Sequence, residues 1–111
     1  MLPKPHRLSR KDDIEQIAKG RGVKKEALLL KFSKNGLKES RFAFIIPSKK
    51  IKKATERNLV KRRARNIIRK NLKNIKGGSD ILFIFSANAL ELDYAGLEKE
   101  LLSALSLAKL L

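Results

Sequence analysis

The sequence of 111 residues contains no cysteine and a single histidine, His6. The lack of cysteine excludes a disulfide framework and thiolate sites for zinc or iron–sulfur clusters. One histidine cannot supply a cluster of imidazole ligands. Acidic residues are also scarce, since 11 Asp and Glu stand against 27 Lys and Arg, which gives a net charge of +16. This imbalance disfavours a neutral metabolic enzyme and destabilises the fold by self-repulsion unless a polyanion is the normal partner.

Long apolar runs are absent too. No stretch approaches the 18 or more apolar residues that a membrane span needs, and the charged start of the chain is not followed by the apolar segment of a secretory signal. We therefore expect a soluble, cytoplasmic protein. The length and the 42% hydrophobic content predict one globular domain over residues 1–111. Residues 1–8 hold two of the three prolines and are expected to form an extended arm.

The apolar periodicity predicts three helices. Ser9 and Asp12 resemble a capping box, and Ile14, Ile17 and Ala18 share one face of a helix over about 10–19. A second helix lies within 53–75, and Asp93 is the expected N-cap of a third.

Strands are expected between these helices. Residues 26–32 and 40–46 are predicted to form a hairpin around Asn35 and Gly36, because Asn-Gly is the strongest short signal for a tight turn. Residues 80–86 form a fully buried strand, and a short extra strand is expected near 21–25. The order α-β-β-(β)-α-β-α predicts an α+β domain, with a small sheet of three to four strands and three helices packed on it.

The positive charge is concentrated in one quarter of the chain. Residues 49–76 hold thirteen Lys or Arg and one acidic residue, Glu56, so they carry +12 of the net +16. Within this segment the apolar stripe predicted to dock on the sheet comprises Val60, Ala64, Ile67, Ile68, Leu72 and Ile75. Basic residues that recur every four positions form a row on another face, namely Arg57, Lys61, Arg65, Arg69 and Lys73.

Such a row is unfavourable in an isolated protein, because like charges four residues apart in a helix repel. A phosphate backbone would offset that repulsion through direct contacts and counterion release. Two alternatives are a merely solvated helix face and a membrane-surface helix. The near absence of acids disfavours the first, and the Val, Ala and Ile of the apolar stripe, which suit a sheet better than a lipid surface, disfavour the second.

The segment from Arg57 to Arg65, RNLVKRRAR, resembles the signature of the bacterial ribonuclease P protein subunit. In that family Arg-Asn, two variable residues, Lys-Arg, two variable residues and Arg lie on the helix after the second strand of the predicted hairpin. The approach through Ser48, Lys49, Lys50 and Ile51 is also similar. The resemblance extends over roughly residues 7–106 and implies a left-handed βαβ crossover of the ribosomal protein S5 domain 2-like type.

The resemblance implies an accessory subunit of an endoribonuclease. Family members bind the catalytic RNA of ribonuclease P and assist removal of the 5′ leader from precursor tRNA. They supply no catalytic side chain and no metal ligand, since Mg²⁺ is held by the RNA. A monomer in a one-to-one ribonucleoprotein without membrane contact is expected. The implied RNA-binding residues are Arg57, Asn58, Lys61, Arg62, Arg65 and Arg69, with Lys49, Lys50 and Lys53 at the edge of the same face.

The family also holds the single-stranded leader in a cleft between the first helix and the sheet, often with aromatic residues. The matching positions in this chain are Ile14 and Ala18 on the helix and Leu30 on the strand, and Phe32 or Phe44 would supply aromatic contact if it faces the cleft. Base stacking on such a ring is worth roughly 1–3 kcal/mol.

Two further function classes compete with this interpretation. A structural RNA-binding protein of the ribosomal or assembly type would carry similar charge. A stand-alone nuclease would need acidic metal ligands, but Asp12, Asp13, Glu91 and Asp93 fall where helix starts are expected and are better explained as caps.

Overall fold

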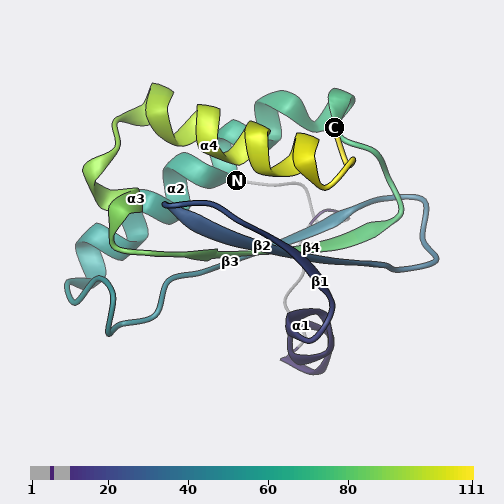
Figure 1. The fold of residues 1–111 in the computed structure, drawn as a ribbon, viewed down its shortest axis with the longest axis horizontal. Helices are drawn as coiled ribbons and strands as arrows, with labels where there is room; N and C mark the ends of the chain where they lie inside the picture. The colour runs from purple at the N-terminus through teal and green to yellow at the C-terminus, as the bar shows by residue number, and fades with distance from the viewer. Residues whose placement is uncertain (1–5, 7–10) are drawn as a thin grey trace.

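The computed structural model describes residue 6 and residues 11–111, and it shows one four-stranded sheet with helices on both faces (Figure 1). The strands are β1 (Arg21–Lys24), β2 (Leu28–Lys34), β3 (Arg41–Ile45) and β4 (Ser79–Phe85). The α-helices are α1 (Lys11–Ala18), α2 (Ala54–Asn71), α3 (Asn88–Glu91) and α4 (Tyr94–Leu107), and a 3-10 turn, η2 (Leu72–Asn74), extends α2. The expected α+β class is confirmed, with four described helices in place of three. In the described part of the chain, no helix is long and apolar enough to cross a membrane.

The sheet order is β1-β2-β4-β3, which corrects the predicted hairpin between β2 and β3. Strand β4 lies between them, antiparallel to β2 and parallel to β3. Asn35 and Gly36 still form a tight turn, in which Gly36 has φ +70° and the Asn35 Oδ1 accepts a hydrogen bond from the Leu37 N–H at 2.7 Å. The turn does not close a hairpin because the most apolar strand takes the central place that buries both its faces. Helix α2 joins the parallel pair β3 and β4, while the left hand of that crossover stays a prediction.

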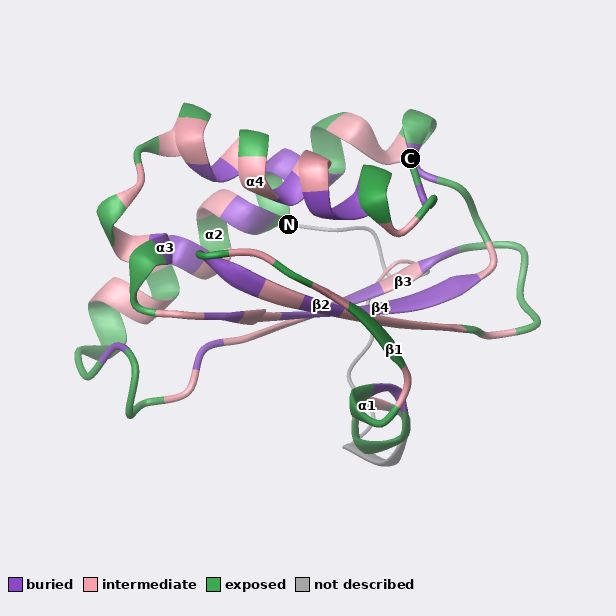
Figure 2. Cartoon of the chain, viewed as in Figure 1, coloured by how far each residue is buried: buried purple, intermediate pink, exposed green. Residues whose placement is uncertain are grey.

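The two faces of the sheet carry separate hydrophobic clusters. Alternate residues of β4, such as Ile81 and Phe83, point into the main core beneath α2 and α4. The residue between them, Leu82, points to the other face, where it packs with Ala43 and with Ile17 of α1. Figure 2 shows the buried sides of α2 and α4 facing the sheet from above, while α1 lies alone below it.

The buried stripe of α2 is the one predicted from the sequence. Val60, Ala64, Ile67 and Ile68 are fully buried, and Ile75 is buried beyond the end of the helix. Helix α4 begins after Asp93, whose Oδ1 accepts a hydrogen bond from the Gly96 N–H at 2.8 Å, which confirms the predicted cap. The expected capping box at Ser9 lies outside the described residues. The short helix α3 was not predicted, since four residues carry too little periodicity to be recognised.

A buried ion pair fixes the end of the sheet nearest the Asn35 turn. Asp80 is 6% exposed and accepts two hydrogen bonds from Arg41, from Nε at 2.8 Å and from Nη2 at 2.7 Å. The Asn35 Nδ2 donates a third at 2.9 Å. One carboxylate thus ties β3, β4 and the turn after β2 together.

We predict that Asp80→Asn lowers the free energy of unfolding by about 1–3 kcal/mol, because the variant keeps the shape but loses the charge that faces a partly buried guanidinium. Urea unfolding of the variant and the wild type measures the difference. A matched Asp93→Asn change should cost only a few tenths of a kcal/mol, since asparagine is an equally good N-cap. Equal losses in the two variants would show that the Asp80 pair contributes no more than a helix cap.

Candidate nucleic-acid interface

The outward face of α2 presents a cluster of polar and basic side chains. Asn58, Arg62, Arg65 and Arg69 are exposed, whereas Arg57 and Lys61 are half-buried. The difference follows from helix geometry, because a step of four residues advances about 40° beyond a full turn. The basic row therefore begins next to the buried stripe at Arg57, and from Arg65 onward its side chains are exposed to solvent. We call the four exposed residues the α2 outer face.

The arginines of the α2 outer face have no acidic partner among the described residues. Three acids of the fold pair with other cations: Asp80 with Arg41, Glu98 with Lys70 and Glu100 with Lys25. No ion pair joins Arg62, Arg65 or Arg69 to a described carboxylate. The positive charge of this face is thus available to an external anion.

Lys70 differs from its basic neighbours because an acidic residue of α4, Glu98, pairs with its charge. Its Nζ lies 3.4 Å from Glu98 Oε2 and 5.0 Å from the centre of the Tyr94 ring. Hydrogen bonding to Tyr94 and then to Glu98 raises the pKa of Lys70 above its ordinary value. The Tyr94 hydroxyl in turn donates to Asn66 Oδ1 at 3.0 Å. These contacts connect α2 to α4 on the side of α2 that adjoins the outer face.

Two arginines of α2 bind the protein's own backbone. The Arg57 Nη1 donates to the carbonyl oxygens of Ile51 at 2.8 Å and Lys52 at 2.7 Å, so its guanidinium secures the segment that enters the helix. The Arg63 Nη1 donates to the Leu92 carbonyl at 3.3 Å and so secures the start of α4. Arg57 thus has a structural role at the edge of the interface, because its guanidinium binds the backbone before α2. The sequence motif did not predict this role.

The lysines that precede α2 lie on an exposed turn. The N–H groups of Lys50 and Ile51 donate to the Pro47 carbonyl at 2.9 and 3.3 Å, and the buried Ile51 side chain anchors this turn to the core. Lys49, Lys50 and Lys53 are all exposed. Lys53 is the N-cap of α2 and makes no capping hydrogen bond with its side chain, so the positive end of the helix adds to the lysine charges.

The structure corrects the residues expected to line a cleft beside α1. Leu30, Phe32 and Phe44 pack into or against the main core, on the sheet face opposite α1. Leu30 is fully buried there. The prediction was wrong about which face of the sheet these side chains occupy. Successive residues of a strand point to opposite faces, and the sequence did not show which face α1 would cover.

The face beside α1 has a different lining. Ile14 is half-buried in the smaller hydrophobic cluster and Ala18 is exposed. A cavity of about 190 Å³ does lie between α1 and the sheet, but its lining is mostly polar and includes none of the five predicted residues. The residues that line it are Gln16, Ile17, Ser33, Lys34, Asn35, Arg41 and Asp80.

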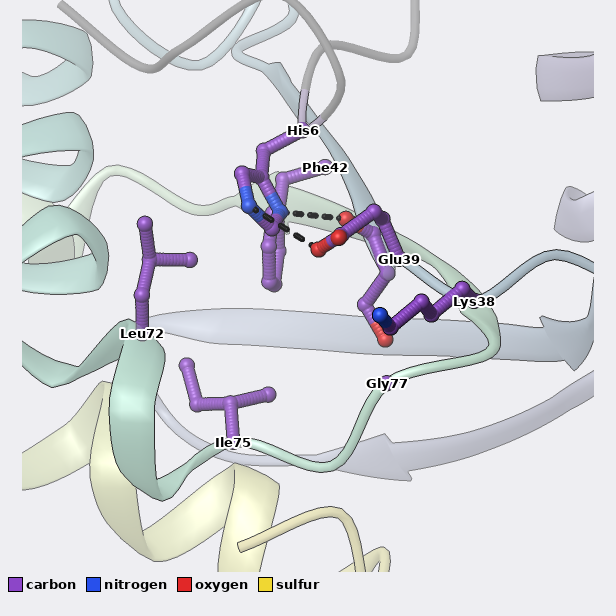
Figure 3. Close-up of a pocket in the computed structure, with 8 residues that line it drawn as sticks. His6, Lys38, Glu39, Phe42, Leu72, Ile75 and Gly77 are labelled. Carbon is purple, nitrogen blue, oxygen red and sulfur yellow. Dashed lines mark hydrogen bonds and ion pairs between the residues drawn. The ribbon is translucent and has the colours of Figure 1, made fainter.

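His6 takes part in a contact that sequence reasoning missed (Figure 3). Its Nδ1 donates to the Ser40 carbonyl at 2.8 Å, and its Nε2 lies 3.4 Å from Glu39 Oε2. The ring lies 6.3 Å from that of Phe42, at the mouth of a cavity of about 190 Å³ that Leu72 and Ile75 also line. His6 thus joins the N-terminal segment to the start of β3. The expected extended conformation of residues 1–5 and 7–8 lies outside the described residues.

Among the side chains that the structure describes, at residue 6 and residues 14–111, no three His, Asp or Glu are grouped closely enough to hold a metal ion. Asp93 caps α4, as described above, and Glu91 closes α3 instead of beginning a helix.

Three comparisons place the chain among known proteins. The family model described as Ribonuclease P matches residues 2–109. The chain is 43% identical over 77 residues to the ribonuclease P protein component of Fusobacterium nucleatum, covering 66% of this chain and 68% of that one. It is 30% identical to the Syntrophomonas wolfei protein of the same name, over 99% of this chain and 92% of the relative.

Solved structures agree with these relatives. The ribonuclease P protein of Thermotoga maritima, in complex with 1-(4-fluorophenyl)-2-thiourea, superposes with a TM-score of 0.80 at 33% identity, over 87% of this chain and 94% of the other. A Staphylococcus aureus ribonuclease P protein mutant superposes with a TM-score of 0.90 at 23% identity, over 97% of this chain and 92% of the other, and supports the fold.

Proposed function

Because the chain belongs to the bacterial ribonuclease P protein family, we propose that it is the protein subunit of a ribonuclease P holoenzyme. In this role it binds the catalytic RNA and the 5′ leader of precursor tRNA, and it assists the endonucleolytic cut that gives the mature tRNA 5′ end. It acts in the cytoplasm as one copy per RNA. The chemistry belongs to the RNA and its Mg²⁺ ions, so no side chain of this protein enters the reaction.

The single observation that supports RNA binding most strongly is the α2 outer face. Its arginines are exposed and lack described acidic partners, while the opposite side of the same helix is fully buried. A guanidinium fork can hold a phosphate through two hydrogen bonds. The Asn58 amide can both donate to and accept from a base edge or a 2′-hydroxyl. The rigid helix therefore presents charge and hydrogen-bonding groups without needing to reorganise.

Lys49, Lys50 and Lys53 extend this surface at the helix N-terminus, and Arg57 and Lys61 form its border next to the core. Each phosphate that they contact releases counterions, so the affinity must fall steeply with added salt. Leader binding in this chain is proposed for the polar cavity beside α1. Ile14 and Ala18 lie near it on α1, but neither offers an aromatic ring.

The direct test is reconstitution. We predict that the protein restores leader cleavage of precursor tRNA by its host's ribonuclease P RNA at low magnesium, where the RNA alone is slow. Arg65→Ala, which removes one cation of the α2 outer face, should need more protein for the same stimulation. Lys99→Ala, which removes an exposed lysine of α4, is the matched control and should stimulate as the wild type does. A protein that binds the RNA tightly without any stimulation would instead indicate the structural RNA-binding role. Cleavage by the protein without RNA would contradict both roles.

A further inference from the structure

A second basic surface lies at the C-terminal end of the fold and is formed by segments other than α2. A groove of about 820 Å³ opens there between the ends of β1 and β2, the segment before β4 and the last residues of the chain. Leu110 accepts a hydrogen bond at its carbonyl from the Lys76 N–H at 2.8 Å, which holds the C-terminus beside that segment (Figure 1). None of the lining residues comes from α2.

The lining of this C-terminal groove is strongly one-sided in charge. Arg21, Lys34, Lys76 and Lys109 line it, and no acidic residue does. All four are exposed and make no ion pair with a described carboxylate. Four unopposed cations around one hollow repel one another, so the groove complements an anion.

The floor of the groove suits a nucleobase. Phe32 is only partly buried and lines the hollow together with Gly77 and Gly78. The two glycines admit the protein's own backbone, because a Cβ at Gly77 would clash with the Lys38 carbonyl oxygen, and Gly78 has φ +91°. A partly exposed phenylalanine in a groove that basic residues also line is the kind of surface on which single-stranded RNA stacks a base while its phosphates are neutralised.

Lys109 supplies an independent observation. It ends α4 in a Schellman motif, where the Leu110 N–H donates to Leu105 at 2.9 Å and the Lys109 N–H donates to Ser106 at 3.0 Å. Its φ is +62°, and among the described residues no other non-glycine residue has a positive φ. Glycine is the residue that adopts this position freely. A lysine held there in spite of the strain places a charge on the rim of the groove, and strained residues of this kind concentrate at functional sites.

We propose that the C-terminal groove is a second RNA-binding site, which takes a single-stranded segment with its phosphates on Arg21, Lys34, Lys76 and Lys109 and a base on Phe32. This inference takes from the proposed function only the assumption that the anionic partner is RNA. The segment belongs either to the catalytic RNA or to the precursor tRNA, and the chemistry of recognition is the same for both.

The strain at Lys109 gives the sharpest test. Lys109→Gly is expected to raise the Tm by a few degrees while weakening binding of a twelve-nucleotide oligouridylate roughly two- to five-fold, with the salt slope reduced by about 0.7. Lys109→Gln should weaken binding equally without raising the Tm. A Lys109→Gly protein that is more stable and binds oligouridylate as well as the wild type would overturn the proposal.

A reporter in the groove separates it from the α2 outer face. The chain has no tryptophan, so Phe32→Trp introduces a unique fluorophore, and oligouridylate should quench it by stacking. Adding Arg65→Ala should leave this titration unchanged, whereas adding Lys76→Gln with Lys109→Gln, neither of which lines the cavity beside α1, should shift it roughly ten-fold to higher concentration. The outcome does not depend on leader cleavage, so the groove and the proposed function can fail separately.

The same reporter identifies the source of the segment. Quenching by ribonuclease P RNA alone assigns the groove to the catalytic RNA, and quenching only after precursor tRNA is added assigns it to the substrate. Either result supports the proposal. Stronger quenching by a polyglutamate peptide than by oligouridylate, or no quenching by any of the RNAs, would contradict it.

Discussion

Replacing Arg62, Arg65 and Arg69 together with alanine is expected to weaken binding to ribonuclease P RNA roughly 100-fold near physiological salt. The slope of log affinity against log salt should fall by about 2–3 units, since each lost phosphate contact contributes about 0.7–0.9. The fold should survive, because all three side chains are exposed and alanine is the best helix former. The affinity is measured by filter binding at several salt concentrations, and the Tm by circular dichroism.

The control for this variant removes the same charge elsewhere. Lys19, Lys24 and Lys99 are exposed and lie off the α2 outer face, before β1, at the end of β1 and on α4 respectively. Their combined replacement with alanine should reduce affinity only a few-fold, through the weaker long-range field. If both triple variants lost affinity equally, the net charge of the protein rather than the α2 outer face would account for RNA binding.

Ile67→Ala should have the opposite pattern, with a large loss of stability and intact RNA binding. Ile67 is fully buried between α2 and the sheet. Removing its side chain should lower the free energy of unfolding by about 3–4 kcal/mol, through lost burial and the cavity that remains. The Tm should fall by roughly 10–20 °C for a domain of this size. Urea unfolding gives the stability, and filter binding well below the new Tm gives the affinity.

The contrast between the two variants carries more weight than either result alone. An Ile67→Ala protein that is still folded but binds RNA as weakly as the triple arginine variant would mean that the buried and outer faces are not separable. Leu107→Ala is a suitable control for the stability measurement, since Leu107 is 62% exposed and its loss should cost well under 1 kcal/mol.

Local patterns predicted the parts of the fold that depend on local physics. The apolar stripe of α2, the Asp93 cap and the buried strand from Ser79 to Phe85 each follow from spacing or from one side chain, and each is confirmed. The predicted pairing of β2 with β3 was wrong, because strand order depends on which strands compete for the central position in the sheet. The Asn35 turn favours a hairpin locally, but β4 buries more apolar surface by entering between β2 and β3.

The candidate site also has features that local spacing predicted and features that depend on distant segments of the chain. Helical spacing located the basic face, yet it could not show that Arg57 and Arg63 bind the backbone, because their partners Ile51 and Leu92 belong to other segments. Phe32 and Phe44 point to the main core. The alternation within one strand shows which residues share a face, but it does not show which of the two faces α1 covers. The C-terminal groove is assembled from four separate segments and has no local signature.

Directed cleavage of the RNA from a single tethered probe tests the central claim, that α2 presents its outer face to RNA while its other face holds the fold. The chain has no cysteine, so Ala54→Cys places one iron chelate on the exposed first turn of α2, and Lys99→Cys places one on α4. We predict strong, localised cuts in the ribonuclease P RNA from the α2 probe and weak, diffuse cuts from the α4 probe. Localised cleavage from α4 together with none from α2 would contradict the account.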